Sequence, residues 1–93
     1  MSAYFIAQLK IHDRDVFDEY SEALAPVFKK YKGRYLAVDE APVLLEGGWD
    51  YSRLVLIEFP DRKSLEEWYY SAEYQEVIKI RFAAAAADVI ITG

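Results

Sequence analysis

The chain has 93 residues, of which 54% are hydrophobic and 16% are aromatic, and it carries a formal net charge of -5 at pH 7. This length suits a single domain over residues 1–93, and the negative charge disfavours nucleic acid and anionic lipid surfaces as partners. Because the chain contains no cysteine, disulfides, thiolate metal sites and thiol nucleophiles are excluded.

The first twelve residues read as a strand and its flanking turn. Over residues 4–11, Phe5 and Leu9 fall on one face and Gln8 and Lys10 on the other, which is the alternation of a half-buried strand. The same alternation lacks the basic leader and unbroken apolar run of a signal peptide. No segment reaches membrane-spanning length, so we expect a cytoplasmic protein.

A helix is expected to follow this strand. Asp13 suits the N-cap, because its side-chain oxygen can accept a hydrogen bond from the first turn, and Gly33 suits the C-terminal stop. Apolar residues between them recur at helical spacing: Val16, Tyr20, Leu24, Val27, Phe28 and Tyr31. Pro26 removes a backbone hydrogen bond inside this pattern, so we expect either a kink or a restart there.

The middle of the chain predicts strands. Residues 34–39 and 43–46 read as two short strands separated by Pro42, which cannot donate a ladder hydrogen bond and therefore indicates either a sheet edge or the start of a new strand. Residues 53–59 are apolar on both faces except at Glu58, which predicts a central strand that is covered on two sides.

Two helical segments and a strand are expected at the end. Asp61 and Ser64 are alternative caps for the first segment, whose buried stripe is predicted to be Leu65, Trp68 and Tyr69. Ser71 suits a fresh cap, so the helix is expected to break and restart, and the break could shape a cleft. The second segment places Tyr74, Val77, Ile78 and Arg81 on one face. The alanines of residues 83–87 favour helix, and residues 88–92 favour a last strand.

This order predicts an α+β protein, a ferredoxin-like βαββαβ sandwich. One sheet face takes the helices. Because the strands look apolar on both faces, the other face needs a cover that this short chain does not supply. A second copy of the same sheet provides one, so we expect a homodimer.

Several short motifs carry a resemblance to a known family. They are YFIA at residues 4–7, the helix with Tyr20 and Pro26, YKGRYL at 31–36, LEGGW at 45–49, IEFP at 57–60, and SAEYQ at 71–75 followed by Arg81. Together they resemble domain-of-unknown-function family 1330 over nearly the whole chain. Ala72 stands where members of that family often have proline.

The resemblance implies a dimeric α+β barrel. Other proteins grouped in that superfamily include cofactor-independent monooxygenases, muconolactone isomerase-like enzymes and haem-degrading or stress-related proteins. The reaction of family 1330 itself is not established, so the resemblance implies the fold and the homodimer and leaves the activity open.

No cofactor is expected from the residue types. His12 is the only histidine and is expected to be a solvated turn residue, and neither the clustered ligands of a metal site nor the glycine-rich fingerprint of a nucleotide site is present. We therefore expect neither metal, flavin nor haem.

The candidate pocket consists of five residues: Tyr20, Glu58, Trp68, Tyr69 and Arg81. A carboxylate between apolar neighbours, such as Glu58, must lie at the exposed end of its strand or have a cationic partner. Arg81, on an apolar helix face, is that expected partner or else an anchor for an anionic ligand. The aromatic residues could equally be core or interface residues. Two function classes follow: a cofactor-free isomerase- or monooxygenase-like enzyme acting on a small apolar metabolite, with an anionic or aromatic group, or a non-catalytic ligand-binding or structural dimer.

Overall fold

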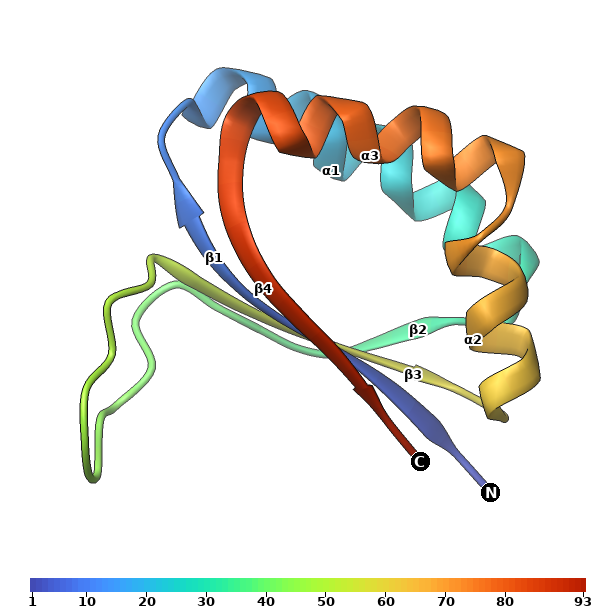
Figure 1. Ribbon diagram of the computed structural model, residues 1–93, viewed down its shortest axis with the longest axis horizontal. Coiled ribbons are helices and arrows are strands. Elements are labelled where there is room, and N and C mark those ends of the chain that lie inside the picture. Colours follow the sequence, from blue (N-terminus) through green and yellow to red (C-terminus); the bar gives the residue numbers. More distant parts are fainter.

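The computed structural model describes residues 1–93. In chain order the elements are β1 (Ala3–Ile11), α1 (Arg14–Lys30), β2 (Arg34–Asp39), β3 (Arg53–Phe59), α2 (Arg62–Tyr69), α3 (Ala72–Ala84) and β4 (Ala85–Thr92) (Figure 1). This is the expected ferredoxin-like α+β order, with the second helix of the motif divided into α2 and α3. None of the three helices combines the length and the apolar character needed to cross a lipid bilayer.

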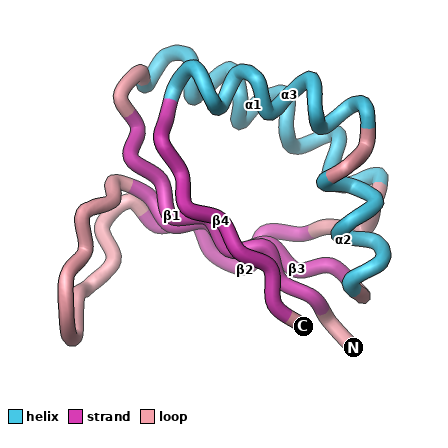
Figure 2. Tube along the Cα trace, in the orientation of Figure 1, coloured by secondary structure: helices cyan, strands magenta, loops and turns pink.

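The four strands form one antiparallel sheet in the order β2-β3-β1-β4, and the helices lie on one face of it (Figure 2). Strand β1 alternates between buried and half-buried residues, so Phe5, Ala7 and Leu9 face the helices. The cross-strand pairs Phe5↔Ile57 and Phe5↔Ile91 carry the same face onto the neighbouring strands. The sheet therefore has one face inside the core and one face that no element of this chain covers.

Helix α1 begins and ends close to the expected positions. The Asp13 carboxylate accepts a hydrogen bond from Val16 N at 3.2 Å, which makes it the N-cap, and the helix continues through Pro26 as one segment. The buried residues are Phe17, Tyr20, Leu24, Val27 and Phe28. Phe17 was absent from the expected stripe, while Val16 and Tyr31 are only partly buried.

The break between α2 and α3 also follows the sequence. Asp61 is the N-cap of α2, because its carboxylate accepts a hydrogen bond from Ser64 N at 2.7 Å. Ser71 caps α3 by accepting from Tyr74 N at 3.1 Å. Since a cap residue leaves the helical conformation, Ser71 turns the chain and lets α3 cross the sheet alongside α1.

Two expectations about strands are wrong. Residues 43–46 form no strand: β2 leaves β3 after Asp39, which pairs with Leu54, and Val43 and Leu45 are 85% and 89% exposed. A strand there would have had no neighbour to pair with. The alanine run is also divided, because α3 ends at Ala84 and β4 begins at Ala85 opposite Ile11. Pairing with β1 thus overrides the helix preference of alanine.

Candidate functional site

A small cavity lies between the helix-facing side of the sheet and helices α1 and α3. Its volume is about 20 Å³, which is enough for one or two water molecules. Most of the side chains that line the cavity from the sheet and from α1 are apolar, and Tyr35, 40% exposed, stands at the rim. The polar side chains that line the cavity are Tyr20, Ser21, Tyr35, Arg53 and Arg81.

Arg81 is the most unusual of these residues. Its side chain is carried by α3 toward the sheet, and the residue is only 4% exposed. Its Nη1 lies 3.4 Å from the Tyr74 hydroxyl oxygen, its Nε has no hydrogen-bond partner, and it forms no ion pair. The guanidinium instead lies near the rings of Tyr20 and Phe82, at 5.9 and 5.6 Å from their centres. A guanidinium buried in this way retains most of its capacity to donate hydrogen bonds.

Two tyrosine hydroxyls lie beside Arg81. The hydroxyl oxygens of Tyr20, in α1, and Tyr74, in α3, are hydrogen-bonded at 2.7 Å. Burial raises the pKa of Tyr20 above its ordinary value, although the positive charge of Arg81 opposes this rise. Burial likewise raises the pKa of Tyr74, and the neighbouring Tyr20 raises it further. Both hydroxyls therefore stay protonated and neutral throughout the physiological pH range, and one of them donates its hydrogen to the other.

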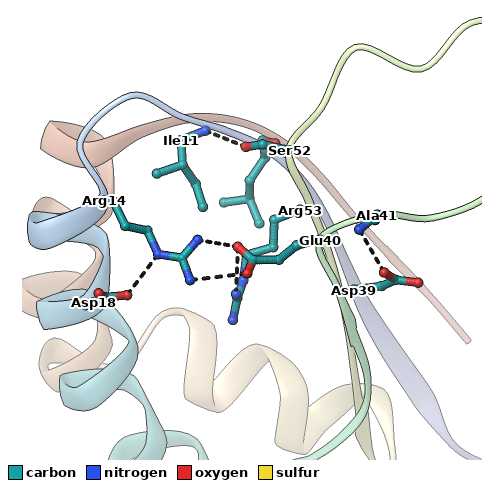
Figure 3. Close-up of polar contacts among 9 residues, drawn as sticks. Ile11, Arg14, Asp18, Asp39, Glu40, Ala41, Ser52 and Arg53 are labelled. Carbon is teal, nitrogen blue, oxygen red and sulfur yellow. Dashed lines mark hydrogen bonds and ion pairs between the residues drawn. The ribbon is translucent and has the colours of Figure 1, made fainter.

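A second arginine reaches the cavity from the start of β3. The Arg53 side chain is 14% exposed, its Nε has no hydrogen-bond partner, and its guanidinium lies 5.2 Å from the centre of the Phe17 ring. Its Nη1 lies 3.5 Å from a carboxylate oxygen of Glu40, which also pairs with Arg14 at the start of α1 (Figure 3). Glu40 thereby links α1, the end of β2 and the start of β3 beside the cavity.

The electrostatic character of the cavity follows from these side chains. Two arginines line it, no carboxylate does, and seven of its twelve lining residues have side chains without a polar atom. Such a site favours a negatively charged group attached to an apolar body. A hydroxyl pair beside a guanidinium can also stabilise an oxyanion that forms during a reaction. The chain contains no cluster of three His, Cys, Asp or Glu side chains suited to a metal ion.

Glu58 does not belong to this site, so the expected pairing of Glu58 with Arg81 is wrong. Its carboxylate accepts a hydrogen bond from Arg34 Nε at 2.7 Å, and the Arg34 contact lowers the pKa of Glu58. Neighbouring Ile57 and Phe59 face the helices, so strand alternation puts Glu58 on the opposite face of the sheet. The ion-pair interpretation was correct, but the partner is Arg34.

The other expected pocket residues lie in three different places. Tyr20 and Arg81 line the same cavity. Trp68 is fully buried in the core, where its ring stacks on Phe59 and packs edge-on against Phe5. Tyr69 lines a different, apolar groove between α2 and β4. Trp68 and Tyr69 thus do not contribute to the cavity with the arginines.

Sequence reasoning missed Arg53 and the pairing of Tyr20 with Tyr74. Arg53 had a usable signal: it stands two residues before Val55 and four before Ile57, so strand alternation places it on the helix-facing side. The tyrosine pair had none, because residues 54 positions apart on different helices meet only through the fold.

The comparisons with known proteins identify the family. The family model described as Domain of unknown function (DUF1330) matches residues 2–93. The chain belongs to this family. Among the curated proteins, none matches the chain.

Solved structures with the same fold include three informative examples. A protein of unknown function from Rhodopseudomonas palustris is 17% identical, with a TM-score of 0.83 over 98% of this chain and 80% of that one. SnoaB, a cofactor-independent oxygenase from Streptomyces nogalater, is 13% identical, with a TM-score of 0.73 over 99% and 91%. A dimeric ferredoxin-like protein of unknown function from Thermobifida fusca is 16% identical, with a TM-score of 0.70 over 100% and 91%. At these identities the likeness establishes the fold alone.

Proposed function

We propose that this DUF1330 protein binds a small organic anion with an apolar body in the cavity between Arg53 and Arg81. The observation that carries the proposal is Arg81, which is 4% exposed, has no hydrogen-bond partner at Nε and forms no ion pair. Burying a charge without a partner is costly, so proteins retain one where a ligand or substrate supplies the opposite charge. A carboxylate is the simplest group that a guanidinium holds with two hydrogen bonds.

The size of the cavity limits how the ligand lies. A volume of about 20 Å³ accepts a carboxylate or a similar head group and little else. The apolar body must therefore extend out through the rim past Tyr35, while Phe17 and Leu24, which are buried, enclose the head group. In this arrangement Arg81 selects the charge of the ligand, and the rim selects its shape.

The enzymatic form of this proposal is a cofactor-free reaction of the isomerase or monooxygenase type. Arg81 and the Tyr20 hydroxyl would stabilise an enolate-like oxyanion of the substrate, and the apolar walls would keep water out. SnoaB, which has the same fold, is a cofactor-independent oxygenase. This supports the proposal only by showing that the fold can carry such a reaction.

One observation favours the non-catalytic alternative. No histidine or carboxylate lines the cavity, so the site has donors that hold an anion and no evident group to remove a proton. A binding protein needs only the donors. Oxygen uptake, together with deuterium exchange at the acidic C–H position of a bound ligand, separates the two forms, because a purely binding site accelerates neither.

We propose in addition that the protein is a homodimer. No helix of this chain packs on the other sheet face, which carries apolar side chains: Ile90 is exposed, and Tyr4, Ile6, Leu54 and Leu56 are half-buried. Three solved structures of this fold are described as dimeric proteins. Two copies that pack these faces together about a two-fold axis would bury both of them, with each copy contributing the same residues.

Matched ligands test the binding proposal. Benzoate and its neutral analogue benzamide share an aromatic body and differ in charge, so thermal shift and calorimetry should detect benzoate-type anions and not the amide. Arg81→Met should abolish this binding. Arg34→Met, which removes an exposed arginine paired with Glu58 on the other face, should leave it unchanged. Failure of every small anion to bind, or equal binding by Arg81→Met, would overturn the proposal.

A further inference from the structure

The loop between β2 and β3, residues 40–52, is here called the arm. It extends from the sheet on the side away from the helices (Figures 1 and 2). Its tip carries three consecutive apolar residues, Val43, Leu44 and Leu45, which are 85%, 52% and 89% exposed. Three consecutive exposed aliphatic side chains are costly on a surface loop unless they meet a partner.

The base of the arm is held in place by several contacts. The Tyr51 hydroxyl donates a hydrogen bond to Asp88 at 2.6 Å, and Lys10 Nζ pairs with Asp50 at 2.7 Å. Ser52 N donates to the Leu9 carbonyl at 2.7 Å. These contacts come from β1 and β4, so the direction in which the arm leaves the sheet is determined by the fold.

The residues that hold the base of the arm also show on which face of the sheet the arm lies. Gln8 pairs with Asp88 across the sheet, while its neighbours Ala7 and Leu9 are buried under the helices. Asp88 and, by alternation, Lys10 therefore belong to the uncovered face. The base of the arm is thus fastened by polar contacts to the face that carries Ile6, Leu56 and Ile90, and its apolar tip projects from the sheet on the same side (Figure 1).

We propose that the arm clasps a second copy of this chain, with the tip formed by Val43, Leu44 and Leu45 packing on the partner. This inference rests on the proposed homodimer. Since both copies in a two-fold dimer present the same surface, an arm that projects beyond the uncovered face meets the body docked on that face. The net charge of -5 disfavours nucleic acid or an anionic membrane as the occupant.

The test measures the dimer dissociation constant by sedimentation. The double change Val43→Ser with Leu45→Ser should raise it at least tenfold, while circular dichroism remains unchanged because both residues are exposed in the single chain. The matched control is Tyr70→Ser with Phe82→Ser, which removes two side chains that are 73% and 64% exposed on the helical layer. The control should leave the dissociation constant unchanged.

A third variant separates the arm from the dimer itself. Ile90→Asp places a charge in the uncovered face and should give monomers. If Ile90→Asp dissociates the protein while the arm variant does not, the arm proposal is overturned and the homodimer stands. If the unmodified protein is a monomer at micromolar concentration, the homodimer proposal itself fails.

A spin label gives a direct readout of the contact. Because the chain has no cysteine, Leu45→Cys provides a unique attachment point. The label should be immobilised in the dimer and mobile when Ile90→Asp is added. Equal mobility in both proteins would overturn the clasp.

Discussion

The hydroxyl oxygens of Tyr20 and Tyr74 lie 2.7 Å apart, joining α1 to α3 inside the protein. Neither hydroxyl is near a carboxylate, and the only charged group beside them is Arg81. Of the two residues only Tyr20 lines the cavity, so the wall beside Arg81 is neutral as long as this hydroxyl stays protonated.

The first prediction concerns alkaline stability. Burial raises the pKa of both tyrosines above the ordinary value of 10.0. Below pH 10 both are protonated in the folded and unfolded chains, so they confer no pH dependence. Above it the unfolded chain loses protons that the folded chain keeps, and stability falls as pH rises. Absorbance at 295 nm should show that at least two of the eight tyrosines ionise only on unfolding.

Variants identify the two groups. Tyr20→Phe should weaken the fall in stability above pH 10, because one retained proton is removed. Tyr70→Phe, at a residue that is 73% exposed, should leave the fall unchanged. Ionisation of all the tyrosines while the circular dichroism is still native would contradict the prediction.

The second prediction concerns the stability of the protein without ligand. Arg81→Met replaces a buried guanidinium by an apolar side chain of similar length. Because no carboxylate loses its partner, the free energy of unfolding should stay the same or rise by about 1 kcal/mol. Urea titration measures this. A loss above about 2 kcal/mol would mean that Arg81 is a structural residue with contacts that the fold requires.

The third prediction concerns a close approach at Gly33. A Cβ atom at this position would lie 2.7 Å from a ring carbon of Phe28 and 2.8 Å from the ring of Phe59. Both rings are buried, so Gly33→Ala should lower the free energy of unfolding by about 1–3 kcal/mol. Gly48→Ala is the control, since a Cβ there meets no atom within 4 Å. Equal stability of the two variants would show that the core can relax around the added methyl group.

The fold was predictable because local signals and burial agree along most of the chain. The caps at Asp13, Asp61 and Ser71 each receive the expected backbone hydrogen bond. The wrong predictions lie where tertiary structure overrides local sequence preference. Alanine residues join β4 because they pair with β1, and residues 43–46 lie outside the sheet because the pairing of β3 with β2 ends at Leu54.

The site was predictable only in part, since periodicity gives the face of an element and not its neighbour. Helical spacing placed Arg81 on the buried face of α3. The same reasoning paired it with Glu58, whose strand position in fact turns its carboxylate to the opposite face, toward Arg34. Charge complementarity alone therefore chose the wrong partner, because it ignored the two-residue period of the strand.

The last prediction concerns the charge beside the cavity. Glu40 pairs with Arg14, whose hydrogen bond holds the pKa of the carboxyl below its ordinary value, and it also lies 3.5 Å from Arg53. Glu40 is thus ionised at neutral pH and competes with any anion that approaches Arg53. Glu40→Gln removes this competing charge, so the affinity for benzoate-type anions should rise several-fold at low ionic strength and less at high salt, where the charge is screened. Asp39→Asn is the control, because Asp39 accepts a hydrogen bond from Ala41 N and touches neither arginine. Calorimetry that finds equal or weaker anion binding by Glu40→Gln, with Asp39→Asn unchanged, would show that Glu40 holds Arg53 in place for the ligand and does not compete with it.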